Sequence, residues 1–209
     1  MKTLLCNSLW AASCLSGSMK FANSAGDVRR AQEKRLSAIL RDNARTEFGR
    51  QHGFSRIRSP DEFRSDVPLC EYEDLKGYIE RIAEGETDIL FPGRPLRLVP
   101  TSGTTSGTKL IPYTEALRRE FQAGISPWIY DMFKSSPRLL AGRSYWSVSP
   151  SGRKDSLTSA GIKIGFDDDA EYLGPVMGRI FGSIAAVPPC VSRIGCAATV
   201  RRISAACLL

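Results

Sequence analysis

The sequence predicts a mixed α/β fold, in which a helical N-terminal part is followed by the beginning of an α/β domain. In the first part, apolar side chains recur with the periodicity of amphipathic helices. From Arg97 onward, short strand-like runs flank a loop rich in serine, threonine and glycine, and another helical pattern follows. The chain is therefore expected to comprise a helical segment 1–95, a partial α/β domain 96–194 and a tail 195–209 of atypical composition.

Composition and charge are those of an ordinary globular protein. The chain has 209 residues, of which 42% are hydrophobic and 24% charged, enough for one sizeable domain or two small ones. Part of the net charge of +7 comes from arginines that follow the last acidic residue, Glu171, and no nucleic-acid-binding motif is present, so we expect no nucleic-acid partner. None of the six cysteines forms a C-x-x-C pair, which indicates reduced thiols and a cytoplasmic protein. No apolar run is long enough to span a membrane, so we expect no membrane partner.

The N-terminal stretch "MKTLLCNSLWAASCLSGS" predicts a buried amphipathic helix. The residues of its apolar stripe are Leu5, Leu9, Ala12 and Leu15. The same stretch has the outline of a weak secretory signal, and "AASC", ending at Cys14, is similar to a lipoprotein cleavage site. Asn7 and Ser8 interrupt the apolar run, which favours the helix.

A second helix is predicted over residues 27–45, with Asp27 as its N-cap. Its charged residues are expected to face water. Its apolar stripe consists of Ala31, Leu36, Ile39, Leu40 and either Asn43 or Ala44.

The motif "SPDEF" predicts the start of another helix, with Ser59 as N-cap, Pro60 in the first turn and Glu62 closing a capping box. A helix over residues 71–83 follows, and Gly85 stands where a C-cap glycine belongs. The apolar side of that helix consists of Tyr72, Leu75, Ile79 and Ile82.

Beyond the turn-rich linker "ILFPGRPL", strands are predicted at 97–99, 109–112 and 144–149. A helix is expected to begin after Thr114, and Pro127 should kink or split it because proline lacks a backbone donor. The residues expected to line this helix are Leu117, Phe121, Ile125, Trp128, Ile129 and Met132.

The segment "TSGTTSGTK", residues 101–109, has the composition of a phosphate-binding loop. Gly103 and Gly107 let the backbone approach a ligand closely, the hydroxyl side chains supply donors, and Lys109 supplies a positive charge. It is not a Walker A loop, because its glycines are too closely spaced and Thr108 stands before the lysine. Composition and spacing alone leave a polar surface turn as the alternative.

This loop resembles the signature of acyl-adenylate-forming enzymes, T-S-G-T-T-G-x-P-K. The additional serine, the missing proline and the following "LIPYT" are more similar to the auxin-responsive Gretchen Hagen family of acyl-acid amido synthetases, particularly its bacterial branch. The resemblance extends over about residues 7–194. Further segments that carry it are "NARTEFGRQHGF", "FRSDVPLCEYEDLKGYIERIAEGE", "YWSVSPSG" and "GIKIGFDDDAEYLG".

The resemblance implies an enzyme that uses ATP and Mg²⁺ to convert a small-molecule carboxylic acid into an acyl adenylate, and then transfers the acyl group to an amine. It implies an adenylate-forming domain for residues 96–194, and identifies no catalytic residue and no metal ligand in this chain. The residues to which it assigns ATP phosphate binding are Ser102, Gly103, Thr104, Thr105, Ser106, Gly107 and Lys109. The acyl substrate, the amine acceptor and the oligomeric state stay open.

Family members are considerably longer, and their later motifs include a glutamate associated with metal and nucleotide, an aspartate for the ribose and a mobile C-terminal domain. These motifs do not occur in the sequence, and the resemblance fades over residues 195–209, as a frameshift or premature stop would produce. We therefore expect an N-terminal fragment that lacks activity by itself. The alternative is a non-catalytic nucleotide-binding or interaction protein that retains only the phosphate loop.

Three other groups of residues are candidates for function and are each expected to be structural. His52, the single histidine, has no nucleophile or carboxylate pattern around it. The acidic residues Asp167, Asp168, Asp169 and Glu171 lack the spacing of a calcium loop and predict a solvated turn. The aromatic residues Trp128, Tyr145 and Trp146 are expected in the core rather than around an acyl pocket.

Overall fold

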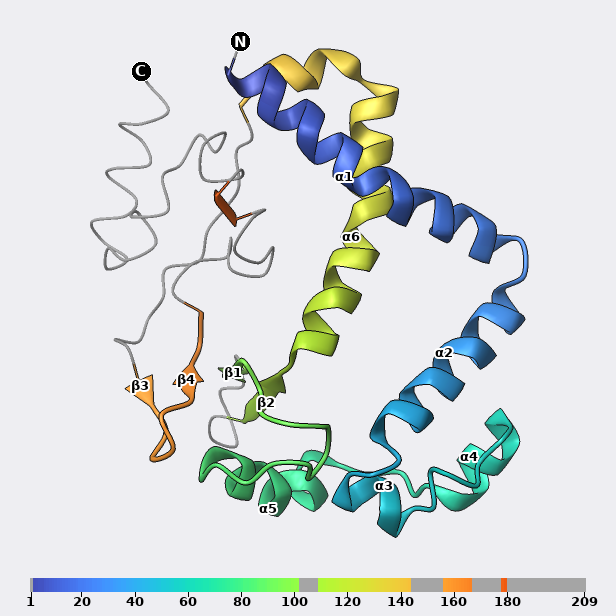
Figure 1. Ribbon diagram of the computed structural model, residues 1–209, viewed down its shortest axis with the longest axis vertical. Coiled ribbons are helices and arrows are strands. Elements are labelled where there is room, and N and C mark those ends of the chain that lie inside the picture. The colour runs from blue at the N-terminus through green and yellow to red at the C-terminus, as the bar shows by residue number, and fades with distance from the viewer. Residues whose placement is uncertain (1, 102–108, 144–155, 167–177, 180–209) are drawn as a thin grey trace. The chain divides into compact units, whose positions relative to one another are not determined.

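A computed structural model describes residues 2–101, 109–143, 156–166 and 178–179 (Figure 1). The predicted fold class is confirmed, since a mainly helical N-terminal part precedes a small mixed four-stranded sheet. The helices are α1 (Lys2–Ala25), α2 (Val28–Asn43), α3 (Glu47–Gln51), α4 (Pro60–Asp66), α5 (Tyr72–Ala83), α6 (Glu115–Ser135) and the 3₁₀ helix η1 (Pro137–Ala141). The strands are β1 (Arg97–Pro100), β2 (Leu110–Tyr113), β3 (Ser156–Leu157) and β4 (Lys163–Ile164).

The described elements belong to two compact units. The helical unit contains α1 up to Ala22, together with α6 and η1. The sheet unit contains helices α2 to α5 and all four strands. The boundaries that the sequence suggests at residues 95 and 194 stay a prediction.

In the helical unit, α1 and α6 cross and share one apolar core (Figure 1). Its buried residues are Trp10, Cys14, Ile129 and Phe133. The rings of Trp10 and Phe133 meet edge to face with their centroids 6.1 Å apart, a favourable geometry for aromatic pairs. A side chain on Gly17 would lie 2.7 Å from Cβ of Ser126, so the small residues of this pair permit the close crossing.

The helix over the N-terminal stretch is confirmed, but its predicted buried stripe is wrong. Leu5, Leu9 and Leu15 are exposed, and the buried positions are Asn7, Trp10 and Cys14. Both stripes have helical spacing, so periodicity alone did not separate them. The packing partner decides between them, because α6 offers a surface that accepts the large Trp10 ring.

The interior of α6 also differs from the sequence prediction. Of the two effects predicted for Pro127, a kink or a split, the split does not occur, because α6 is continuous through this residue. Ile129 is buried as expected, but Leu117, Phe121 and Trp128 are exposed, so the placement of Trp128 in the core is wrong. Phe133, which the sequence pattern missed, is buried because it faces Trp10.

In the sheet unit, the predicted helix ends are largely confirmed. The Asp27 carboxylate accepts a hydrogen bond from the amide of Arg30 at 3.0 Å, and the Ser59 hydroxyl accepts one from the amide of Glu62 at 3.2 Å. The Glu62 carboxylate bonds the amide of Arg58, one residue before the position that a capping box requires. Gly85 ends α5 with φ of +104°, which glycine adopts without strain.

Helix α2 packs on the segment that follows α3 through a small apolar cluster. Leu40, Phe54 and Ile57 are its buried members. Of the predicted stripe on α2, Leu40 is buried but Ile39 is exposed, because the cluster lies along only one edge of that stripe.

The sheet has the strand order β2-β1-β4-β3. Strands β1 and β2 are antiparallel, with Arg97 opposite Tyr113 and Pro100 opposite Leu110, which confirms both strands. Strand β4 joins β1 in parallel through Leu98 and Ile164, and Leu98 is completely buried. The strand predicted at 144–149 lies outside the described residues.

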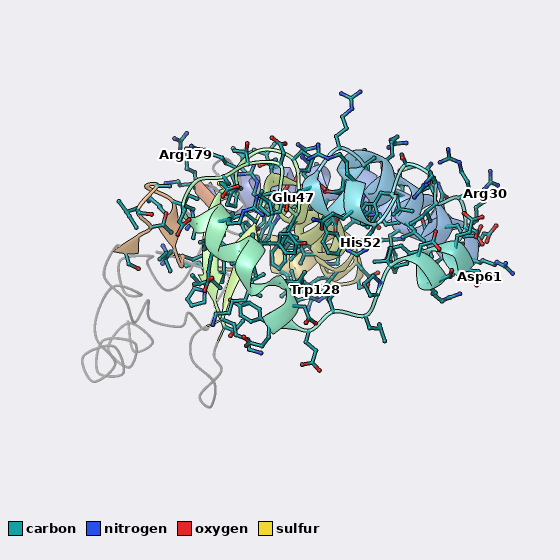
Figure 2. The ribbon with its side chains drawn as sticks, turned by 90° about the horizontal axis from the view of Figure 1, so that it is seen from below. Arg30, Glu47, His52, Asp61, Trp128 and Arg179 are labelled. Atoms are coloured by element: carbon teal, nitrogen blue, oxygen red, sulfur yellow. The ribbon has the colours of Figure 1, made fainter. Side chains whose placement is uncertain are left out.

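Arg81 connects α3, α5 and the turn that follows α5. Its guanidinium makes a bidentate pair with the Glu47 carboxylate, at 2.9 and 2.8 Å, and also bonds Glu86 at 2.7 Å. The hydrogen bonds from Arg81 hold the pKa of both the Glu47 and the Glu86 carboxylates below their ordinary value. Glu47, which lies at the start of α3, is labelled in Figure 2.

This pairing predicts a loss of stability in acid. A lowered pKa in the folded state contributes stability above the ordinary carboxyl value near 4.5, and this contribution is lost as pH falls through the lowered value. We expect Arg81→Gln to lower the melting temperature at neutral pH, because two ion pairs are lost. The decrease should be only a few degrees, since both carboxylates contact solvent, and it should disappear in strong acid, where the carboxylates are protonated. Thermal unfolding followed by circular dichroism over this pH range measures the difference.

Arg64→Gln is the matched control, because it removes the exposed pair between Arg64 and Asp61 within one helix. It should change the melting temperature little at any pH. A deficit of Arg81→Gln that does not diminish in acid would show that the ion pairs are not its cause.

Candidate phosphate-binding site

The predicted phosphate loop connects the two strands of a hairpin. Beyond the last β1–β2 pair, the amide of Thr101 donates a hydrogen bond to the carbonyl oxygen of Lys109 at 2.9 Å. The two ends of the segment 101–109 are therefore held side by side. The predicted site residues between them, Ser102, Gly103, Thr104, Thr105, Ser106 and Gly107, lie outside the described residues.

Lys109, the remaining predicted site residue, lies against Tyr72. Its ammonium nitrogen is 5.1 Å from the centroid of the Tyr72 ring, within the range of a cation–π contact. The next residue of the chain contacts the same side chain, since the amide of Leu110 donates to the Tyr72 hydroxyl at 3.0 Å. One tyrosine therefore contacts two consecutive residues at the C-terminal end of the loop.

Tyr72 is held in place by the start of helix α5, of which it is the first residue. Glu71 and Asp74 form a reciprocal capping box, in which the Asp74 carboxylate accepts from the amide of Glu71 at 2.8 Å. Helix α5 in turn packs on strand β2, which begins at Leu110. The capped helix end thus sets the position of the Tyr72 ring beside the loop.

Within the described ranges, Lys109 contacts an aromatic ring rather than a carboxylate. Among the residues that the structure describes, the ion pairs do not include Lys109, and the contact of its ammonium is with the Tyr72 ring. A ring attracts a cation through its quadrupole and leaves the positive charge in place. An ammonium in this state is suited to an anionic ligand such as a phosphate group.

Sequence reasoning placed Tyr72 only on the apolar side of its helix and missed its contact with the loop. Its hydrogen-bond partner lies 38 residues further along the chain. The available signal was a tyrosine at the first position of a capped helix, where a side chain points beyond the helix end. That signal did not identify the partner.

The other candidate residues do not form a second site in the described part of the chain. His52 packs on the ring of Phe48, with centroids 4.2 Å apart, and its amide bonds the Phe48 carbonyl oxygen, in agreement with a structural role (Figure 2). The residues Asp167, Asp168, Asp169, Glu171, Tyr145 and Trp146 lie outside the described residues.

Within the described ranges, no group of histidine, cysteine, aspartate and glutamate residues could hold a metal ion, and no helix is long and apolar enough to cross a membrane. Among the described residues, Cys6, Cys14 and Cys70 form no disulfide bond. Burial raises the pKa of Cys14, so this thiol stays protonated and behaves as a small apolar side chain.

The chain is similar to known proteins in sequence and in fold. The model of the GH3 family N-terminal domain matches residues 17–172, well over half of the chain. The chain is 39% identical over 109 residues to an indole-3-acetic acid-amido synthetase, GH3.15, of Arabidopsis thaliana, an alignment that covers 50% of this chain and 18% of that protein. It is 33% identical over 100 residues to a jasmonoyl–L-amino acid synthetase, JAR6, of Nicotiana attenuata, covering 47% of this chain and 17% of that protein.

A solved structure of the GH3.15 acyl acid amido synthetase is similar to this fold, with a TM-score of 0.65 and 25% identity. The superposition covers 86% of this chain and 31% of that one. The chain thus spans less than a third of the solved relative and a smaller share of the two curated proteins. Because the family model matches most of its length, the chain belongs to the GH3 family of acyl acid amido synthetases.

Proposed function

We propose that this chain provides the ATP-phosphate-binding part of an acyl acid amido synthetase. The observation that carries the proposal is the β1–β2 hairpin, which holds Thr101 and Lys109 together at the two ends of a segment rich in serine, threonine and glycine. The loop residues Ser102 to Gly107 would supply amides and hydroxyls to the phosphates, and Lys109 would supply a positive charge. The magnesium ion is expected to enter with ATP, bound to its phosphate oxygens.

The proposed reaction has two steps. A carboxylate oxygen of the acyl acid attacks the α-phosphorus of ATP, which forms an acyl adenylate and releases pyrophosphate. An amine then attacks the acyl carbonyl carbon, and the amide forms as AMP leaves. The protein's contribution to such a reaction is mainly to position the reactants and to stabilise the charge on the phosphate oxygens.

The substrates are proposed by class. The names of the two relatives refer to indole-3-acetic acid joined as an amide and to a jasmonoyl group joined to an L-amino acid, and each acyl group derives from a carboxylic acid. We propose a small carboxylic acid and an amine, such as an amino acid, as the partners of this chain. We also propose a cytoplasmic protein without a nucleic-acid partner.

The first experiment is a titration of the purified chain with MgATP. We expect saturable binding that replacing both Gly103 and Gly107 by valine abolishes, because side chains at these positions would keep the backbone from the phosphates. Gly124→Val is the control, since a side chain at Gly124 on α6 meets no atom within 4 Å. Absence of MgATP binding by the unaltered chain would contradict the proposal.

The second experiment tests whether the chain completes the first chemical step. Because it spans 31% of the solved relative, we expect the 209-residue chain to bind ATP without supporting ATP–pyrophosphate exchange. The assay uses a panel of carboxylic acids that includes indole-3-acetic and jasmonic acids. Robust exchange would show that the 209 residues suffice for acyl adenylate formation.

A further inference from the structure

We propose that Tyr72 is a positioning residue for ATP binding, which holds Lys109 and the end of the loop in the orientation that receives phosphate. This inference rests on the proposed function, because it concerns the same nucleotide site. It extends that proposal to a residue outside the loop, on helix α5. Two separate contacts of Tyr72 carry it.

The first contact fixes the backbone. The amide of Leu110 donates to the Tyr72 hydroxyl at 3.0 Å, while the carbonyl oxygen of Lys109, one residue before, accepts from Thr101 at 2.9 Å. The peptide between Lys109 and Leu110 is therefore bonded through its carbonyl to Thr101, the residue after strand β1, and through its amide to helix α5. A peptide held from both sides loses rotational freedom, so ligand binding has less entropy to overcome.

The second contact orients the charge. The Tyr72 ring holds the Lys109 ammonium 5.1 Å from its centroid, and the described part of the chain offers this lysine no ion pair. A carboxylate in the place of the ring would compete with phosphate for the ammonium. A cation–π contact engages one side of the ammonium and leaves N–H donors for a phosphate, so Lys109 can bind a nucleotide while it stays over the ring.

The chain provides a matched control on the same helix. Tyr78 of α5 is also half-buried, and its hydroxyl donates to Gln51 at 2.7 Å while its ring meets Phe48 at 6.0 Å. Among the described residues, the hydroxyl and the ring of Tyr78 contact α3. Tyr72→Phe and Tyr78→Phe therefore remove the same hydroxyl from the same helix, but only the first removes the hydrogen bond to Leu110, the residue that follows the loop.

The first test measures the dissociation constant for MgATP of the 209-residue chain. Tyr72→Phe should weaken binding about threefold, because it removes the hydrogen bond to the amide of Leu110, which fixes the peptide that follows Lys109. Tyr72→Leu should weaken it about tenfold, because it also removes the cation–π contact. Tyr78→Phe should stay within about twofold of the unaltered chain.

The second test separates positioning from a general structural effect. With Lys109→Gln in place there is no cation for the ring to hold, so Tyr72→Phe and Tyr72→Leu should then bind MgATP equally. A purely structural role of the ring would preserve the difference between them, and that result would overturn the inference. Thermal unfolding of each variant confirms that the proteins compared are folded.

The two proposals fail in different ways. If the unaltered chain binds MgATP but both Tyr72 variants bind as tightly, the inference about Tyr72 is wrong and the phosphate loop stands. If the unaltered chain does not bind MgATP, the proposed function and the inference are both rejected. Both proposals are supported if Tyr72→Phe and Tyr72→Leu weaken MgATP binding while Tyr78→Phe does not. The two Tyr72 variants must also bind MgATP equally when Lys109→Gln is present.

Discussion

Replacing Gly49 by alanine is expected to destabilise the sheet unit by about 3 kcal/mol, the upper range for overpacking a filled site. Gly49 is buried in α3, and a Cβ atom built on it would overlap with the carbonyl oxygen of Asn43 and lie 3.0 Å from its carbonyl carbon. That carbonyl also accepts hydrogen bonds from the amide and hydroxyl of Thr46, so it is poorly able to move away.

The control for Gly49→Ala is Gly77→Ala on α5, where an added Cβ meets no atom within 4 Å. Alanine should stabilise this exposed helical position by about 0.5–1 kcal/mol, because glycine loses more backbone entropy on folding. Urea unfolding followed by far-ultraviolet circular dichroism gives both free energies of unfolding. Effects of equal sign and size at the two glycines would rule out the steric explanation.

Replacing Asn7 by alanine is expected to destabilise the helical unit by about 2 kcal/mol, because the backbone carbonyl oxygens that accept from the Asn7 amide would lose their donor. Asn7 is completely buried in α1. Its amide nitrogen donates to the carbonyl oxygens of Leu140 at 2.9 Å and Gly142 at 3.0 Å, at the C-terminal end of η1. A single side chain thereby holds the end of η1 on α1, and these bonds span more than 130 residues of sequence.

Asn43→Ala is the control, because the Asn43 amide bonds the carbonyl of Ile39 within its own helix in an exposed position. Its effect should stay within about 0.5 kcal/mol. Asn7→Asp should be worse than Asn7→Ala at neutral pH, because it places carboxylate oxygens against carbonyl oxygens. Urea unfolding followed by far-ultraviolet circular dichroism measures both variants, because helices of both units contribute to the signal. Equal free energies of unfolding for Asn7→Ala and Asn43→Ala would contradict the prediction.

Helix ends were predicted well because their physics is local. The side chain of Asp27 bonds an amide three residues away, as does that of Ser59, and the left-handed backbone of Gly85 is a property of one residue. The two strands that flank the predicted phosphate loop were found for a similar reason, because each is a short local pattern, whereas their antiparallel pairing was not predicted. Resemblance to a family then assigned phosphate binding to the loop, which composition had left undecided.

Buried faces were predicted less well because a helical period permits more than one stripe. On α1, leucines formed one stripe, and Asn7, Trp10 and Cys14 formed the one that is buried. On α6, Trp128 belonged to the predicted stripe but is exposed. Burial depends on the surface of the partner element, and that surface comes from a distant part of the chain.

The sequence by itself determined the family, through motifs spread along the chain, and most of the helix ends, because a helix cap depends on neighbouring residues. Phosphate binding by the segment 101–109 stays a prediction. The tertiary structure alone decided that Asn7 closes the end of η1 and that Tyr72 holds Lys109 and Leu110. Both contacts join segments that are far apart in sequence. In both, the periodicity of the sequence does not identify the partner of the polar group. A buried or half-buried polar side chain is stabilised only by a specific partner, and the folded chain supplies that partner.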